Sequence, residues 1–169
     1  MKKPAWTTPL FLQVNKLVGR WSIIDQLMVL SAHYLLFILL GVLMYQWWKM
    51  DVFFVQLLVF AVIFAGSLGV SYSVAVVWRR PRPIHQLLGI KILIQTMGTW
   101  KSFPSDHTIG ATIVGYGAFL IFSGWQLVIF LFFAAIVAFS RVWVGVHYPR
   151  DIVGGFLVAS GVILLTYFF

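Results

Sequence analysis

The sequence predicts an all-α fold, a polytopic helical bundle in a membrane with about five transmembrane helices. Of its 169 residues, 62% are hydrophobic and only 9% are charged, a composition typical of membrane proteins. A transmembrane helix requires about 20 predominantly apolar residues, and five runs of the chain approach or exceed that length. Because these runs use most of the chain, we expect one membrane-embedded domain over residues 1–169.

The N-terminal region, residues 1–20, is too polar to span a membrane. Its apolar side chains recur at helical spacing, which predicts an amphipathic helix that lies in the membrane interface. The basic residues are Lys2, Lys3, Lys16 and Arg20, and the apolar residues are Leu10, Phe11, Val14, Leu17 and Val18.

Five apolar segments follow, and each is expected to form a transmembrane helix. Ser22 and Asp25 resemble a capping box at the start of the first segment. His33 lies within that segment, where an isolated histidine is more often a hydrogen-bonded interior residue than a ligand, so we assign it no role in a site. The predicted spans are residues 23–48, 52–78, 106–122, 126–144 and 149–169.

The polar region between the second and third spans, residues 79–104, is interpreted as an active-site loop region. Basic residues flank many spans simply to set topology, but three arginines in a proline-stiffened turn also suit an anion site. Residues 84–100 mix apolar and polar side chains, which predicts a short interfacial helix beside the site. The arginine turn reads Trp78-Arg79-Arg80-Pro81-Arg82-Pro83.

The stretch from Ser140 to Asp151 places a histidine and a carboxylate between two apolar segments. Pro149 predicts that a helix begins there, because proline suits the first helical position. Asp151 then falls in the first turn, from which its carboxylate can reach back to His147. A histidine oriented in this way presents its other nitrogen to an electrophile, and the adjacent helix N-terminus favours anions. We therefore predict a phosphoryl group as the electrophile.

Tracing the five spans alternately across the membrane brings the arginine turn, the start of the third span and the His147 stretch to one face. Ser105 suits the N-cap of the third span, and His107 lies in its first turn. Two helix N-termini would therefore point at the same place, together with the arginines. This arrangement predicts a phosphate site formed without metal.

Composition narrows the chemistry and the partners. The sequence has no cysteine, no glutamate and four aspartates, so neither a thiolate site nor a multi-carboxylate metal centre is expected, and we predict no metal and no cofactor. The formal net charge of +8 has three explanations: binding to anionic lipid headgroups, binding to an anionic substrate, or membrane topology alone. We expect membrane lipids as partners and no nucleic acid.

The chain resembles the type 2 phosphatidic acid phosphatase superfamily, also called lipid phosphate phosphatases, over about residues 50–165. That family shares its catalytic motifs with vanadium haloperoxidases. The first motif is a lysine, six residues, then Arg-Pro, and the second is Pro-Ser-Gly-His. The third is Ser-Arg, five residues, His, three residues, Asp, and it is complete here as Ser140, Arg141, His147 and Asp151.

The other two motifs depart from the family pattern. The second is present from Pro104 to His107, with Asp106 in place of glycine. Arg82 with its following proline is the preferred match to the first, yet the residue seven positions earlier is Ala75, not lysine. Aligning Arg80 instead places Ser73 there. The residues that could supply the missing positive charge are Arg79, Arg80 and Lys101.

The resemblance implies a metal-independent lipid phosphatase that works through a phosphohistidine. His147 would be the nucleophile, and Asp151 would orient its ring and stabilise its positive charge. His107 would protonate the leaving oxygen and later activate water. The residues expected to hold the phosphoryl oxygens are Arg82, Arg141 and Ser105, with Arg79 and Arg80 as further phosphate-binding candidates.

Asp106, the following Thr108 and the missing lysine together resemble the bacterial undecaprenyl-diphosphate phosphatase branch. The expected substrate is therefore a lipid phosphate or diphosphate, foremost undecaprenyl diphosphate, with phosphatidylglycerophosphate or phosphatidic acid as the alternative. A non-enzymatic lipid flippase or small anion transporter is the alternative class of protein. A transporter would need the arginines, but neither a nucleophile oriented by a carboxylate nor a second histidine that acts as an acid. Haloperoxidase chemistry is disfavoured, because that resemblance is to soluble enzymes.

Location and orientation follow from the resemblance as well. It implies the bacterial cytoplasmic (inner) membrane, with the active site facing outward. The excess of basic residues on the site's face points the other way, toward the cytoplasm. Arginines retained for phosphate carry little topological information, but six of the other seven lysines and arginines also share the site's face. We expect the outward orientation on the ground of the family resemblance. The sequence does not indicate an oligomeric state.

Overall fold

The computed structural model describes residues 6–96, 98, 100–166 and 168, and its regular secondary structure is helical. The all-α prediction is confirmed, while Lys2 and Lys3 of the predicted interfacial segment lie outside the described residues. The helices are α1 (Thr8–Asn15), α2 (Ser22–Leu30), the π-helical segment η1 (Ser31–Leu35), α3 (Leu36–Lys49), α4 (Phe53–Val77), α5 (Pro83–Gln86), α6 (Asp106–Phe119), α7 (Gly124–Trp143) and α8 (Pro149–Leu165).

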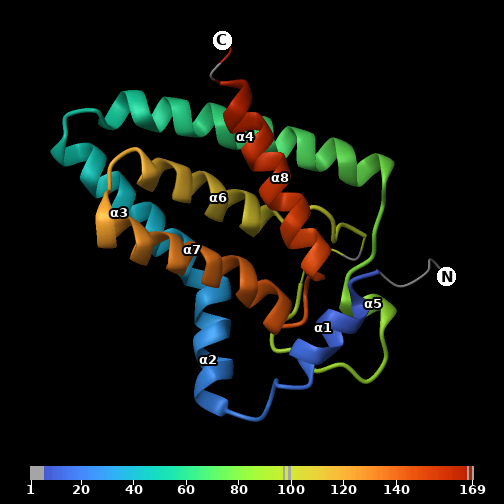
Figure 1. Ribbon diagram of the computed structural model, residues 1–169. Coiled ribbons are helices and arrows are strands. Elements are labelled where there is room, and N and C mark those ends of the chain that lie inside the picture. The colour runs from blue at the N-terminus through green and yellow to red at the C-terminus, as the bar shows by residue number, and fades with distance from the viewer. Residues whose placement is uncertain (1–5, 97, 99, 167, 169) are drawn as a thin grey trace.

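Helix α6 lies in the middle of the bundle (Figure 1). It packs against α3, α4, α7 and α8, and 9 of its 14 residues are buried. Small residues allow this, because a Cβ atom at Gly117 would come within 2.7 Å of a Leu43 methyl group on α3. The helix that carries Ser105 and His107 at its start is therefore enclosed by the rest of the bundle.

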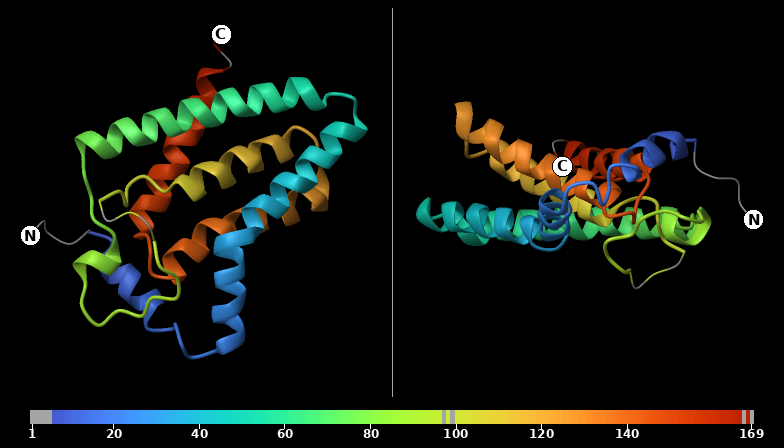
Figure 2. Two further views of the ribbon diagram at one scale, coloured as in Figure 1. Left: turned by 180° about the vertical axis from the view of Figure 1, so that it is seen from behind. Right: turned by 90° about the horizontal axis from the view of Figure 1, so that it is seen from below.

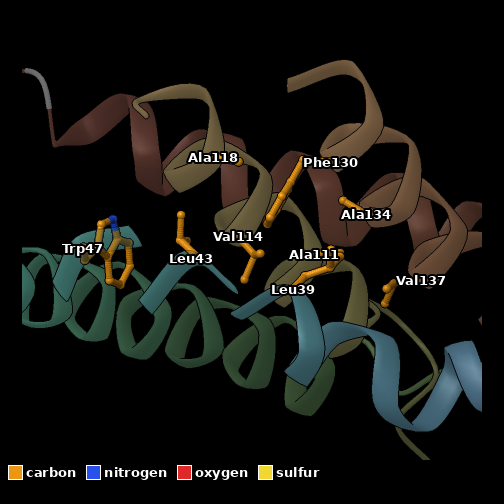
Figure 3. Close-up of a cluster of buried hydrophobic side chains, with 9 residues drawn as sticks. All are labelled: Leu39, Leu43, Trp47, Ala111, Val114, Ala118, Phe130, Ala134 and Val137. Carbon is orange, nitrogen blue, oxygen red and sulfur yellow. The ribbon is translucent and has the colours of Figure 1, made fainter. Parts of the chain in front are cut away.

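The main hydrophobic core joins α3, α6 and α7 (Figure 3). One face of each helix contributes three buried side chains, so the three helices bury a continuous apolar surface. The residues are Leu39, Leu43 and Trp47 of α3, Ala111, Val114 and Ala118 of α6, and Phe130, Ala134 and Val137 of α7.

Within the described residues, three helices are long and apolar enough to cross a membrane, by length and composition. They are the continuous helix Ser22–Lys49, α4 and α7, with 28, 25 and 20 residues. The third and fifth predicted spans form helices as well, but α6 has 14 residues and α8 has 17. The chain is an integral membrane protein in which three of the five predicted spans reach membrane-crossing length.

The first span bends where α2 meets α3, and the π-helical segment Ser31–Leu35 lies at the bend (Figure 1). A π-helical turn widens the helix and displaces a backbone carbonyl from its usual partner. His33 lies in this turn, and its Nδ1 is 2.9 Å from the carbonyl oxygen of Val29. The ring is hydrogen-bonded as expected, but it lies on an exposed face and not in the interior.

The predicted capping box at the start of the first span is wrong. Trp21 occupies the N-cap position, and no side chain caps the first turn. Asp25 instead accepts a hydrogen bond from the Gly19 amide at 2.8 Å, and another from Trp143 Nε1 of α7 at 2.8 Å. Asp25 therefore bonds to groups outside its own helix and does not cap the first turn.

The interfacial helix predicted over residues 84–100 is also wrong, since only Pro83–Gln86 is helical and the described residues beyond it form a loop. The loop's backbone groups pair with other segments. Asn15 of α1 donates to the Lys91 carbonyl at 2.7 Å and accepts from the Lys91 amide at 2.9 Å. The Leu93 amide donates to the Val144 carbonyl at 3.1 Å, so this loop is fixed beside the segment that carries His147.

Helix α1 lies at the same end of the bundle as this loop. It covers Thr8–Asn15, a shorter stretch than the helix predicted over residues 1–20. Phe11 is buried, and its ring meets the Tyr148 ring edge-on with centroids 5.4 Å apart. Figure 2 shows α1, the loop after α5 and the start of α8 gathered at one end of the molecule. The N-terminal helix is therefore part of the wall around the predicted site.

The start of α8 lies directly against the start of α6. A Cβ atom at Gly155 would come within 2.6 Å of the Ser105 carbonyl oxygen, so only glycine permits this approach. We expect Gly155→Ala to destabilise the protein by about 1–3 kcal/mol through overpacking, measured by thermal unfolding in detergent. Gly161→Ala, on the same helix with open space at the Cβ position, is the control. Equal unfolding temperatures in the two variants would contradict the close approach.

Candidate active site

The centre of the site is the pair of His147 and Asp151. His147 lies in the turn between α7 and α8 and is 3% exposed, and Asp151 in the first turn of α8 is fully buried. Asp151 Oδ2 is 3.6 Å from His147 Nδ1, which is close enough for an ion pair but longer than a hydrogen bond. The carboxylate therefore faces Nδ1 of the ring, and Nε2 is the nitrogen on the other side.

Hydrogen-bond donors surround the buried carboxylate. Asp151 Oδ2 accepts from Ser102 Oγ at 2.6 Å and from the Tyr148 amide at 2.8 Å, and Oδ1 lies 3.3 Å from Arg150 Nε. The Tyr148 contact is the reach back from the first turn that the sequence predicts. A buried charge without such partners would be very costly, so these donors keep Asp151 ionised beside the histidine.

Burial favours the neutral form of His147. Removal from water lowers the pKa of the imidazole, and the charges of Arg82 and Arg141 lower it further, whereas Asp151 raises it. Desolvation is the largest of these effects, so the pKa lies below the ordinary value. The ring is therefore neutral near pH 7, with a nitrogen lone pair available for attack.

Two arginines lie beside this pair, each held by a backbone carbonyl. Arg141 Nη1 donates to the Ala32 carbonyl of the π-helical segment at 2.9 Å, and Arg82 Nε donates to the Lys101 carbonyl at 3.1 Å. Among the described residues, buried Arg82 Nη1 and Arg141 Nε have no acceptor. Burial lowers the pKa of Arg82, although an arginine stays charged at neutral pH. Two positive groups with unused donors suit an oxyanion.

The start of α6 supplies the second histidine. Ser105 is the N-cap, and its Oγ accepts from the Thr108 amide at 3.4 Å. His107 follows in the first turn, within electrostatic reach of Arg141, His147 and Arg82. The Ser105 amide donates to the Asp151 carbonyl at 3.0 Å, which ties the two helix starts together. The structure therefore brings His107, His147, Asp151, Arg82 and Arg141 to one place.

Arg79 and Arg80 lie in the loop region beside this group, and the Arg80 carbonyl accepts from the Ser102 amide at 2.8 Å. The Arg80 guanidinium lies over the Trp78 ring, 4.5 Å from its centroid, and Arg79 lies 5.8 Å from the Trp100 ring. Both arginines therefore stack on aromatic side chains of the loop region.

Ser102 and Ser71 have polar contacts at the site but no assigned role in the sequence analysis, which names Lys101 only as a possible source of the missing positive charge. Ser102 holds Asp151, as described above. Lys101 Nζ lies 2.7 Å from both carboxylate oxygens of Asp106, and Ser71 Oγ of α4 donates to Asp106 Oδ1 at 2.9 Å. Ser102 stands two residues before the second motif, and this proximity in sequence is the one signal that could have indicated it.

An apolar groove of about 1050 Å³ begins beside the site and follows α6 between α7 and α8. Four of its lining residues are neighbours of site residues in the chain, namely Thr108, Val142, Pro149 and Ile152. Phe119 and Leu164 line it at the opposite ends of α6 and α8. The groove therefore connects the polar site to the apolar part of the bundle.

These features define an integral membrane protein with a buried cluster of polar side chains, a His–Asp pair and two arginines, at one end of a helical bundle. A sequence model of the PAP2 superfamily matches residues 54–169, and the chain belongs to that superfamily. The resemblance inferred from the three motifs is thereby confirmed.

The chain is similar to named members of the family. Undecaprenyl-diphosphatase BcrC of Bacillus subtilis is 36% identical over 112 residues, which are 58% of this chain and 52% of that protein. The bacitracin transport permease protein BcrC of Bacillus licheniformis is 30% identical over 154 residues, covering 86% of this chain and 71% of that protein. The match thus spans about half the length of the Bacillus subtilis protein.

The fold also matches a solved structure. The crystal structure of Aquifex aeolicus LpxE has a TM-score of 0.77 to this chain, with 22% sequence identity. The match covers 100% of this chain and 99% of that one. The two chains therefore share a similar arrangement of helices.

Proposed function

We propose that the protein is a membrane phosphatase that removes the terminal phosphate of undecaprenyl diphosphate, leaving undecaprenyl phosphate, through a phosphohistidine. The observation that carries the proposal is the buried His147–Asp151 pair beside arginines with unused donors. The name of the Bacillus subtilis relative supports the diphosphate substrate. The apolar groove beside Thr108 and Pro149 supports a lipid as the rest of the substrate.

In the first step, His147 Nε2 attacks the terminal phosphorus as the bond from phosphorus to the leaving oxygen breaks. Asp151, on the Nδ1 side, stabilises the positive charge that develops on the ring. Arg82 and Arg141 offset negative charge on the equatorial oxygens. His107, protonated once the negatively charged substrate is bound, donates its proton to the leaving oxygen, so the products are a phosphohistidine and the shortened lipid phosphate.

In the second step, water attacks the phosphohistidine. His107, now neutral, takes a proton from the water as the bond between nitrogen and phosphorus breaks. Inorganic phosphate is released, and both histidines return to their starting states. We place these steps at the outer face of the bacterial cytoplasmic membrane, on the ground of the undecaprenyl-diphosphatase resemblance.

Transport is the second candidate function, and the name of the Bacillus licheniformis relative favours it. A transporter would use Arg82 and Arg141 to recognise an anion, but it has no need of a carboxylate that orients His147. The two functions therefore differ in what they require of the imidazole.

The first test removes the nucleophile. We expect His147→Ala to abolish phosphate release from purified protein, and Asp151→Asn to lower it by a factor between about 10² and 10⁴, because the ring loses its orienting charge. Release is measured with undecaprenyl diphosphate, phosphatidylglycerophosphate and phosphatidic acid, so that the assay also separates the alternative substrates. Parental turnover by folded His147→Ala protein would exclude this nucleophile.

Vanadate separates the enzyme from a transporter. Vanadate can adopt a five-coordinate shape with an imidazole as apical ligand, so an enzyme should bind it far more tightly than phosphate. We expect competitive inhibition that is lost in His147→Ala. Near-equal affinities for vanadate and phosphate, in both proteins, would favour the transporter.

Chelation tests the absence of a metal requirement. No three His or Asp side chains lie together as a metal-ligand set within the part of the chain that the structure describes. Because the sequence also lacks Cys and Glu, we expect hydrolysis to persist in excess EDTA. Loss of activity with EDTA, restored by added Mg²⁺, would indicate a different catalytic class.

A further inference from the structure

The pair of Lys101 and Asp106 lies beside the proposed active site without a part in the two steps above. Its ion pair is close, with Lys101 Nζ 2.7 Å from both carboxylate oxygens. Ser71, fully buried on α4, donates to Oδ1 of the same carboxylate. The side chains of Lys101 and Asp106 are 20% and 44% exposed, so an anion can reach the pair from outside.

The backbone fixes Lys101 among the site residues. Its carbonyl accepts from Arg82 Nε, and the next residue, Ser102, donates to Asp151. Asp106 directly precedes His107 at the start of α6. Asp106 also lies within electrostatic reach of His107 and Arg82, so the carboxylate that holds the ammonium links Lys101 to the His107 side of the site.

This position determines which part of a substrate the ammonium would meet. In an in-line displacement the leaving oxygen stands opposite the nucleophile. His107 serves the leaving oxygen, so the group bonded to that oxygen lies on the side of Lys101 and Asp106. In a diphosphate that group is a second phosphate, and in a monophosphate it is an uncharged carbon chain.

Lys101 has the donor capacity for such a contact. An ammonium group has three N–H donors, and within the described residues its acceptors are the two oxygens of Asp106. The third donor can therefore reach a phosphate while Asp106, held from behind by Ser71, keeps the ammonium in place. Arg80 lies beside Lys101 through the backbone, since its carbonyl accepts from the Ser102 amide at 2.8 Å, but its guanidinium lies over the Trp78 ring.

We propose that Lys101, positioned by Asp106, binds the phosphate that remains on the lipid and makes the site selective for diphosphates over monophosphates. This inference rests on the proposed function. In a lipid monophosphate the contact has no counterpart, so Lys101 contributes to the rate with one class of substrate only.

The test compares farnesyl diphosphate with farnesyl monophosphate, which share one lipid chain and differ in the second phosphate. We expect Lys101→Met to lower the ratio of kcat/KM for the diphosphate to that for the monophosphate by at least about 10-fold, the effect of one charge-assisted hydrogen bond. Lys101→Arg should retain most of the ratio. Lys49→Met, at the other end of the bundle, is the control and should leave both values unchanged.

A second variant guards against misfolding. Lys101→Met leaves Asp106 without its partner, whereas Lys101→Met/Asp106→Asn removes both charges and should show the same loss of ratio. An equal fall in both kcat/KM values, or an unchanged ratio, would overturn the inference and leave the phosphatase intact. Parental protein that releases phosphate from neither compound nor from undecaprenyl diphosphate would overturn the proposed function itself.

Discussion

The burial of one negative charge, on Asp151, is the constraint on which the rest of the site depends. A fully buried carboxylate needs donors, and here they come from separate parts of the chain: Ser102 from the loop before α6, and Tyr148 from the turn before α8. Satisfying the charge therefore fixes the loop and the turn relative to each other. His147, two residues before Pro149, is placed by the same requirement.

The close contact of two helix starts extends this constraint to the second histidine. The Ser105 amide donates to the Asp151 carbonyl, and Gly155 permits the Ser105 carbonyl to lie directly against α8. His107 is two residues further along α6. The distance between the two histidines is therefore set by backbone contacts in the core of the bundle, not by flexible loops.

Local features of the site could be predicted from the sequence, and tertiary ones could not. The relation of His147 to Asp151 follows from a spacing of four residues and a proline at the helix start, both of which act within one turn. The contact of Ser102 with Asp151 joins residues 49 positions apart, so no periodic pattern reveals it. The same holds for Asp25, whose spacing from Ser22 indicated a cap but whose partners are Gly19 and Trp143. Residues 87–96 have the composition of an interfacial helix, yet Asn15 and Val144 pair with their backbone.

The π-helical turn at Ser31–Leu35 has a consequence for how this chain can vary. A π-helical turn holds about one residue more than an α-helical turn for the same rotation, so the helices on its two sides keep their faces toward the bundle. On one side of the turn, the face of α3 that carries Leu39 and Leu43 belongs to the core, and within the turn the Ala32 carbonyl receives Arg141. Both faces are in register because the wide turn takes up the extra residue. The loss of one residue within Ser31–Leu35 can therefore be absorbed by return to an α-helical turn, whereas the loss of one residue within α2 or α3 would rotate one of the two faces about 100° away from the bundle.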